Sequence, residues 1–329
     1  MSWFPALRHR AVDDERPWSP EEVALLAEAV RRAPSVHNLQ PWSLRVRDRT
    51  AVLCRRPGPD LLEHDPDGRD QRISCGAAVA NLAVVLRGLG WEGEVRWWTD
   101  SEGPDAEAVV TATRRCRATQ VDRERRRAVE RRSSYRRPFA ARAVPHLTRT
   151  AIVAASTVQA AWVVGEDEER EVARQLAYAA RANRSDLRYQ RELGAWTGGG
   201  DVGLVAGALA DTGTPAAGLV RDRTRPPGEA VLARWLQDEA LLVFSTLTDG
   251  PRDHLLAGEA AERAWLEATR LGLVASVMTQ PLRLSEVRSG IRDALGLAGV
   301  PQLLMRLGYP EAVPVPRTER RPLPDLFDD

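Results

Sequence analysis

The stretch Ala33-Pro34-Ser35-Val36-His37-Asn38-Leu39-Gln40-Pro41-Trp42 separates a predicted helix from a predicted strand. The helix begins at Ser19-Pro20-Glu21-Glu22, because serine can cap a helix, proline suits its first turn and Glu22 completes a capping box. Apolar residues then recur at helical spacing until Pro34, where the helix should end. From Trp42 to Val46 apolar and polar residues alternate, which predicts a strand.

Helical and strand-like patterns continue through the rest of the chain. Further strands are expected near residues 51–54, 95–98, 108–113, 159–164, 241–247, 274–278 and 302–307. Further helices are expected over 74–89, 122–132, 147–155 and 167–190. The helix over 122–132 is dense in arginine and glutamate and should be exposed, and the proline-rich chain after Tyr309 should run extended over the surface.

Two helical stretches share the same pattern of small residues. Gly76, Ala78 and Gly90 in the first have the offsets of Gly258, Ala260 and Gly272 in the second, and each opening glycine is expected near the start of its helix. Small residues let a helix pack closely against a neighbour. The match suggests that a domain was duplicated, although two amphipathic helices can also coincide in spacing.

Length and composition limit the classes of protein that fit. The 329 residues, 43% of them apolar, suffice for two domains or one large α/β unit. The 47 basic and 46 acidic residues nearly cancel, which argues against a dedicated nucleic-acid binder. Every basic residue is arginine, so Schiff-base chemistry on lysine is excluded.

The cysteines and the apolar segments indicate the compartment. The three cysteines lie far apart without a CxxC pair, which is typical of reduced thiols in a cytosolic protein. The first eighteen residues lack the apolar core of a signal peptide, and no run approaches a membrane span. We therefore expect a cytoplasmic protein without membrane contact. The five histidines are dispersed and show no metal-ligand spacing.

The 33–42 stretch resembles the nitroreductase superfamily, whose members carry proline-serine, then asparagine, then Gln-Pro-Trp. Residues 131–139 are similar to the phosphate-binding element of that superfamily, and 272–281 and 301–323 match it further. The set covers nearly the whole chain and looks like the Acg-like branch of actinobacterial nitroreductase relatives. The resemblance implies an α+β fold of the nitroreductase type, with FMN as the cofactor.

The order of the two elements implies a fused pair of domains. In ordinary nitroreductases one chain carries the arginine-serine element first and the Pro-Ser element later, and two chains pair around each FMN. Here the Pro-Ser element lies in the first half, 1–121, and the arginine-serine element opens the second half, 122–329. We expect two tandem nitroreductase-like halves that form a pseudo-dimer, a monomer with one complete FMN site.

The resemblance implies a residue set for the phosphate of FMN. Arg132 and Arg136 are expected to neutralise its charge, with Ser133 or Ser134 as hydrogen-bond donors and Arg320 or Arg321 as a third cation. In a second alignment of the motif Arg131 replaces Arg132. The register with Arg136 is preferred because it also places Pro138-Phe139.

A second residue set is implied for the rest of the cofactor. Its members along the ribityl chain and the ring edge are Pro34, Ser35, Asn38 and Gln40. Thr279 and Gln280 resemble the segment that runs along the ring near its redox-active nitrogen. No residue is nominated as a catalytic acid or base, and His37 is more often a structural histidine than a proton donor.

Residues 194–228 are rich in glycine, proline and threonine and are expected to be irregular. Long loops of this kind are often lids, and the apolar stretch 202–209 needs a surface to cover, so we expect a lid over the flavin. The resulting function is a nitroreductase-type oxidoreductase that takes electrons from a small-molecule donor such as NAD(P)H and passes them to a nitro, quinone or enone acceptor. The alternative is a protein that stores or sequesters FMN with little turnover.

Overall fold

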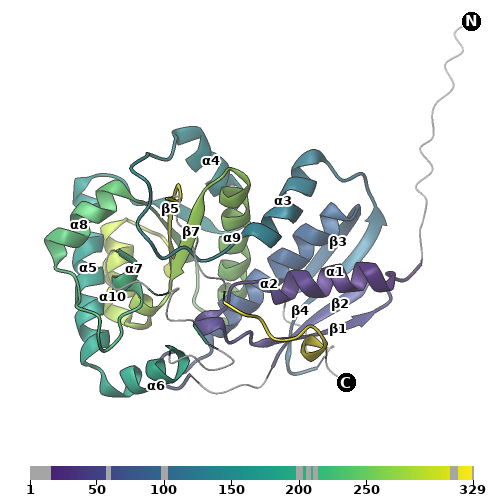
Figure 1. Cartoon of the computed structure of the whole chain (residues 1–329), viewed down its shortest axis with the longest axis horizontal. Helices are drawn as coiled ribbons and strands as arrows, with labels where there is room; N and C mark the ends of the chain where they lie inside the picture. Colours follow the sequence, from purple (N-terminus) through teal and green to yellow (C-terminus); the bar gives the residue numbers. More distant parts are fainter. Residues whose placement is uncertain are drawn as a thin grey trace, which may run out of the picture.

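The computed structural model describes residues 16–56, 61–97, 103–197, 203–204, 209, 214–311 and 318–327. Within these ranges eight strands form two four-stranded antiparallel sheets, with helices between and around them (Figure 1). The strand order is β1-β2-β4-β3 in the first sheet and β5-β6-β8-β7 in the second. The two orders coincide when β1 to β4 are matched in turn with β5 to β8.

The first sheet and its helices come from the first 131 residues. Their bounds are α1 Pro20–Arg31, β1 Trp42–Arg47, β2 Thr50–Arg55, α2 Arg69–Gly88, β3 Trp91–Trp97, β4 Ala106–Arg115 and α3 Gln120–Arg131. The capping box predicted for α1 is confirmed, because the Ser19 hydroxyl accepts from the Glu22 N–H and the Glu22 carboxylate accepts from the Ser19 N–H at 2.9 Å. Helix α2 starts five residues before the predicted 74, because the Asp65 carboxylate caps it by accepting from the Asp70 and Gln71 N–H groups.

The second sheet and its helices follow. Their bounds are α4 His146–Ala154, β5 Gln159–Trp162, α5 Glu166–Ser185, α6 Leu187–Thr197, α7 Thr214–Gly218, α8 Glu229–Asp238, β6 Ala240–Thr246, α9 Pro251–Arg270, β7 Val274–Met278, α10 Ser285–Ala294 and β8 Val300–Gly308. Helices α8 and α10 were not predicted. From the sequence, Gly76 and Gly258 were expected near the starts of their helices. In the structure both glycines lie inside their helices, α2 and α9. The reason is that Asp65 and the pair Gly250-Pro251 start these helices earlier.

Two sequence expectations between β5 and β6 were wrong in part. The helix predicted over 167–190 breaks at Asp186, whose carboxylate accepts from the N–H groups of Arg188 and Tyr189 and so starts α6. The segment 194–228 is not wholly irregular, since it contains the end of α6 and all of α7. Its Gly198–Gly200 and most of its apolar stretch lie outside the described residues.

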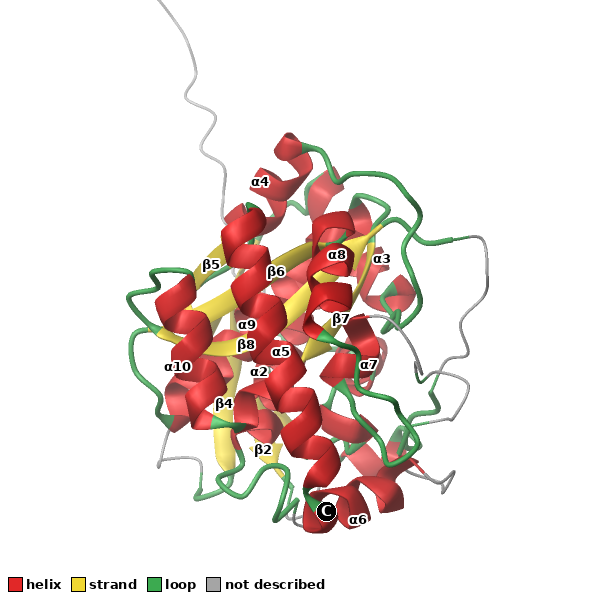
Figure 2. Ribbon diagram, turned by 90° about the vertical axis from the view of Figure 1, so that its left-hand side faces the viewer, coloured by secondary structure: helices red, strands yellow, loops and turns green. Residues whose placement is uncertain are grey.

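Helices cover both faces of the second sheet. On one face α5, α8 and α10 pack against side chains such as Leu241 and Val243, and Figure 2 shows these helices in front of the sheet. On the other face α9 packs against Leu242 and Phe244. The alternation of facing residues along β6 explains why the whole strand is apolar and buried.

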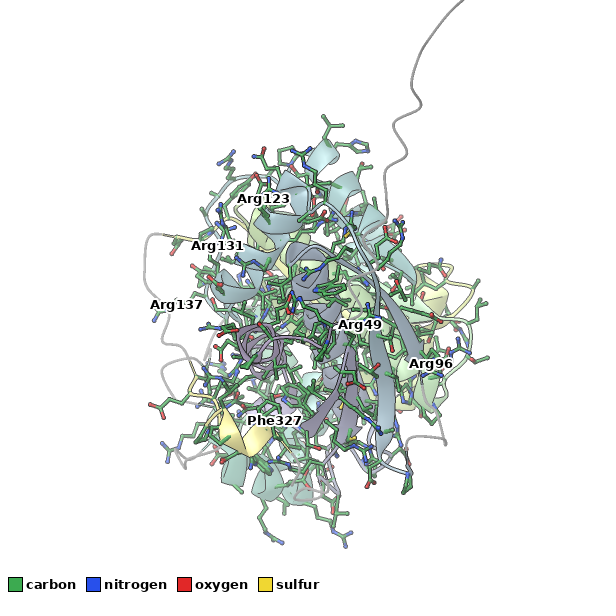
Figure 3. The ribbon with its side chains drawn as sticks, turned by 90° about the vertical axis from the view of Figure 1, so that its right-hand side faces the viewer. Arg49, Arg96, Arg123, Arg131, Arg137 and Phe327 are labelled. Carbon is green, nitrogen blue, oxygen red and sulfur yellow. The ribbon has the colours of Figure 1, made fainter. Side chains whose placement is uncertain are left out.

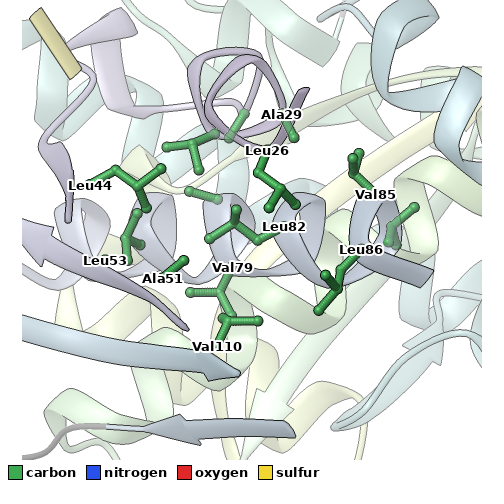
Figure 4. Packing of buried hydrophobic residues seen from close by; sticks show 14 of the residues in the cluster. Leu26, Ala29, Leu44, Ala51, Leu53, Val79, Leu82, Val85, Leu86 and Val110 are labelled. Atoms are coloured by element: carbon green, nitrogen blue, oxygen red, sulfur yellow. The ribbon is translucent and has the colours of Figure 1, made fainter. Parts of the chain in front are cut away.

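The first sheet packs one face against α2, and α1 lies over that helix. The core between them consists of side chains such as Leu26 of α1, Leu82 of α2 and Leu53 of β2, as Figure 4 shows. Arg123, in the first turn of α3, and Arg131, its last residue, lie on the outside of the molecule, and Figure 3 places Arg137 there too. No helix in the described ranges is both long and apolar enough to cross a membrane.

Helices α2 and α9 lie side by side between the two sheets (Figures 1 and 2). Gly76 and Gly258 stand at their crossing. A Cβ atom at Gly76 would lie 1.9 Å from the carbonyl oxygen of Leu255, and one at Gly258 would lie 1.9 Å from that of Ile73. Ile73 and Leu255 each precede the glycine of their own helix by three residues, so the same contact is made in both directions.

The chain after β8 returns to the first half. The Arg321 N–H donates to the Gln40 side chain at 3.0 Å, and the Arg321 carbonyl accepts from Arg31. Phe327 pairs with Leu44 beside β1. The described part of this tail, yellow in Figure 1, therefore lies along α1 and β1. It is extended at 318–323, as expected from its prolines, but Pro324–Leu326 form a 3-10 helix in which Leu326 is buried.

We expect Gly76→Ala and Gly258→Ala each to lower the free energy of unfolding by about 1–3 kcal/mol or more, because the added methyl group would overlap the facing backbone. Urea denaturation monitored by circular dichroism measures the change. The matched control is Gly194→Ala in α6, where nothing lies within 4 Å of an added Cβ. That change should stabilise the helix by up to about 1 kcal/mol. Equal stability of the three variants would contradict the close crossing.

Candidate functional site

A cleft with an empty volume of about 1080 Å³ opens where the 33–42 stretch, the start of α2, the middle of α9 and the end of β7 meet. The segment after α3 adds Ser134 and Arg136, and the tail adds Arg320. The excursion between β5 and β6 adds Leu204, Pro215, Gly218 and Leu219. The cleft is thus lined from both halves of the chain.

The wall formed by the 33–42 stretch is a tight turn. His37, Asn38 and Gln40 have φ angles of 46°, 61° and 53°, in the left-handed region that costs energy for residues other than glycine. Hydrogen bonds hold the turn: the Ser35 hydroxyl accepts from the Gln40 N–H, and the Ser74 hydroxyl of α2 accepts from the Val36 N–H, both at 3.0 Å. The turn directs His37 and Asn38 into the cleft.

His37 is the first of three linked side chains. Its Nε2 lies 3.2 Å from Nδ1 of His64, and Nε2 of His64 lies 2.9 Å from the Asp70 carboxylate. Arg69 also pairs with that carboxylate at 2.7 Å. Burial alone would raise the pKa of Asp70, but Arg69 and His64 lower it below the usual range, so Asp70 is charged.

These hydrogen bonds fix the tautomers of both histidines. The charged Asp70 can only accept, so when His64 carries a single proton, that proton is on Nε2, and Nδ1 is left to accept from His37. His37 then carries its proton on Nε2, and its Nδ1 is an acceptor without a hydrogen-bond partner among the described residues. Burial, followed by His64, lowers the pKa of His37 well below its usual value, so His37 is neutral at pH 7.

Two arginines bring positive charge to the cleft. Arg136 forms no ion pair within the described residues, and burial together with Arg306 lowers its pKa to about 10. Arg320 donates to the side-chain oxygen of Asn38, and its Nε has no hydrogen-bond partner in the described part of the chain. Burial and the neighbouring arginines lower the pKa of Arg320 to about 9. Both guanidinium groups remain charged at neutral pH.

A carboxyl group also lines the cleft. Glu262 of α9 is 1% exposed, and its Oε1 lies 3.1 Å from Nε of Arg132. Arg132 also donates to the Arg32 carbonyl at 2.6 Å and stacks 4.6 Å from the ring centre of Trp265. Burial raises the pKa of Glu262 to about 7, although Arg132 and Arg320 oppose the shift.

Of the residues that the sequence nominated, eight line the cleft: Pro34, Ser35, Asn38, Ser134, Arg136, Thr279, Gln280 and Arg320. Four do not. Gln40 is turned away, because its side chain holds the Arg321 N–H and the Asn38 carbonyl. Arg321 contacts the Gln40 side chain through its backbone N–H. Arg132 is turned toward Glu262. Ser133 is half-buried and lies outside the lining.

Sequence reasoning missed His64, Asp70 and Glu262. His64 and Asp70 follow the second strand with no motif that joins them to His37, so only the folded chain brings the three together. Glu262 did carry a signal. It shares a helical face with Gly258, Ala261 and Trp265, and an acid on a face of small and aromatic residues is unusual.

No protein-family model matches the sequence. A protein of Mycobacterium tuberculosis strain H37Rv named "Putative NAD(P)H nitroreductase Rv3131" is 32% identical over 342 aligned positions, which cover 97% of this chain and 96% of that protein. "Putative NAD(P)H nitroreductase acg" of the same strain is 28% identical over 90% of this chain and 92% of its own. A solved FMN- and NADPH-dependent nitroreductase, NfnB from sphigopyxis sp. strain HMH, covers 62% of this chain and 97% of its own at 18% identity and a TM-score of 0.39.

We expect Asp70→Asn to reverse the hydrogen bonds of the two histidines. Arg69 would hold the amide oxygen, so the amide nitrogen would donate to His64, and the proton of His37 would move from Nε2 to Nδ1. The ¹⁵N shifts of the imidazole nitrogens report this exchange, and only five histidines need assignment. The control is Asp249→Asn beside His254, a pair at 2.9 Å that should leave His37 unchanged. An unchanged His37 in Asp70→Asn would contradict the linkage.

Proposed function

The chain belongs to the family of these mycobacterial nitroreductases, and from that premise we propose that it is an oxidoreductase that binds one FMN in the cleft. The observation that carries the proposal is the meeting of two motif elements from opposite ends of the sequence. Ser35 and Asn38 come from the first half, and Ser134, Arg136 and Arg320 come from the second half and the tail. The set offers hydroxyl, amide and guanidinium groups to a single ligand.

The residues present fit a flavin nucleotide. The guanidinium group of Arg136 has no ion-pair partner within the described residues, and Arg320 keeps an unused Nε, so both can meet a phosphate. The buried Gln280 Oε1 lacks a hydrogen-bond partner in the described part of the chain and can accept from an N–H or hydroxyl group. We propose that Ser134, Arg136 and Arg320 hold the phosphate.

The remaining nominated residues would hold the sugar chain and the ring. We propose that Pro34, Ser35 and Asn38 contact the ribityl chain and the ring edge, and that Thr279 and Gln280 lie along the ring. Gln40, Arg132, Ser133 and Arg321 would support these residues from behind. The bound cofactor would supply the hydride chemistry, and the protein would position it and tune its electronic properties.

We further propose that the chain is two fused nitroreductase-like halves, 1–121 and 122–329, that act as a monomer with one complete site. The equal strand orders of the two sheets support this arrangement. So does the contact between α2 and α9, which repeats in both directions as in an interface between identical subunits. Each half then contributes one of the two cofactor-binding elements.

We propose that the electron donor is NAD(P)H and that the acceptor is a nitro, quinone or enone compound, in keeping with the names of the relatives. One observation favours the storage alternative. Leu204, Pro215, Gly218 and Leu219 lie in the cleft lining, and α7 is buried throughout, so this part of 194–228 would act as a lid that restricts access to the flavin.

We expect the purified protein to show a flavin spectrum and to release one FMN per chain on denaturation, because the complete set of elements is present once. Adding NADH or NADPH without oxygen should bleach the spectrum within seconds if the protein is an oxidoreductase. Slow bleaching with a full complement of FMN would favour storage. Two FMN per chain would contradict the single site, and a chain that binds no FMN would contradict the proposed function.

We expect Arg136→Ala to weaken FMN binding by about tenfold to a hundredfold, since the loss of a charged hydrogen-bond partner costs about 1.5–3 kcal/mol. Fluorescence titration of the apoprotein measures the affinity. The control is Arg137→Ala, because Arg137 is the adjacent arginine but lies outside the cleft lining and on the outside of the molecule (Figure 3). Equal affinities of the two variants would show that Arg136 does not meet the phosphate.

A further inference from the structure

The carboxyl group of Glu262 is the feature of the cleft that the proposed function leaves unexplained. It is a buried acid in the wall of a site that is proposed to receive an anion. Neither of its oxygens has a hydrogen-bond partner in the described part of the chain, although Oε1 faces Arg132 at 3.1 Å. Its side chain is 0% exposed and that of Arg132 is 2% exposed, so water does not screen the pair.

Charged groups reach Glu262 from several elements. From its own helix, Glu259 is turned to Arg263 at 2.8 Å. The uncharged Ser276 of β7 and Leu303 of β8 complete the wall beside it. The other charged and titratable groups in the described lining are Arg136 after α3, Arg320 of the tail, His37 of the turn, His64, and Asp70 at the start of α2. Arg132 meets Glu262 from outside the lining, and Arg31 and Arg32 act on Arg320.

Two of these cations act on Glu262 and would also attract a phosphate. Arg132 and Arg320 are the groups that lower the pKa of Glu262, against the larger effect of burial, which raises it to about 7. A phosphate dianion beside Arg320 would compete for the same positive charge and would repel the carboxylate. Both effects disfavour the charged form of Glu262. The neutral form of Glu262 is therefore more strongly favoured when the phosphate is bound than in the free protein.

We propose that Glu262 couples flavin binding to the uptake of one proton, so that the carboxyl group is neutral when the phosphate of FMN is bound. The inference rests on the proposed function, since it concerns the same cleft. The proton comes from solvent and stays on the carboxyl group, and no bond of the cofactor changes. Glu262 thus determines how tightly the site holds a doubly charged phosphate, and Arg132 is kept in place by the same carboxyl group.

The sign of the pH dependence follows from the direction of the shift. The free protein loses the proton of Glu262 as the pH rises through about 7, whereas the complex retains it. Affinity for FMN therefore falls with rising pH. Between pH 7.0 and pH 8.5, where the phosphate is already a dianion, one coupled proton predicts a loss of about 15-fold in affinity. Arg320 titrates only at the upper edge of this range.

The test is fluorescence titration of the apoprotein with FMN at pH 7.0, 7.75 and 8.5, for the wild type and Glu262→Gln. We expect the wild type to lose about 15-fold in affinity and Glu262→Gln to lose less than threefold. The control is Glu267→Gln, because Glu267 lies on the same helix but pairs with Arg125 and Arg270 away from the cleft. This variant should keep the wild-type dependence. Riboflavin, which has no phosphate, should bind with little dependence on pH.

A second measurement needs no variant. Calorimetric titration of the wild type at pH 8.0 in two buffers of different ionisation enthalpy counts the protons taken up, and we expect about one per FMN. Binding of FMN without proton uptake and with equal pH dependence in the wild type and Glu262→Gln would overturn this inference alone. No binding of FMN at pH 7.0 would overturn the proposed function and the inference with it.

Discussion

The close crossing of α2 and α9 is the constraint on which the rest of the structure depends. Two helix backbones touch only where neither carries a side chain, and Gly76 and Gly258 meet this condition for each other. The crossing fixes how far apart the two sheets lie, because each helix is packed on its own sheet. It also brings Ile73 and Ala77 of α2 beside Ala261 and Trp265 of α9, and these side chains form the floor of the cleft. A wider crossing would separate the 33–42 stretch from the segment of Ser134 and Arg136, which line the same cleft.

Around this floor, the cleft wall contains a strained backbone turn and a buried charged pair, and both cost free energy of folding. The turn at residues 35–40 keeps three residues other than glycine at positive φ, and the cleft wall holds a buried acid together with arginines. Each of these features is compensated locally, the turn by two hydroxyl groups and Glu262 by Arg132. Backbone strain and buried charges of this kind are typical of ligand sites, because the side chains there are oriented toward a ligand rather than toward each other.

The sequence predicted what depends on local pattern. The capping box of α1, the alternation in β1 and the apolar runs of β6 and β8 each lie where the pattern put them, since each is decided by residues close together in the chain. The sequence motifs also nominated eight residues that line the cleft. Pairings between distant residues were not: nothing in the sequence shows that Arg132 meets Glu262 or that His64 links His37 to Asp70. The break between α5 and α6 was missed because a single Asp186 decides it inside a continuous helical pattern.

The tail that returns along α1 has a consequence for the order of events in biosynthesis. Asn38 and the arginine that it binds are 282 residues apart, so the contact closes a loop almost as long as the chain. Such contacts form late, because the entropy of closing the loop must be overcome before the contact contributes. The turn at 35–40 is synthesised long before Arg320, so the first part of the chain can begin to fold before this contact is possible. Any ligand held between Asn38 and Arg320 is therefore captured only after Arg320 has been made, and a nascent chain truncated before it would lack the finished site.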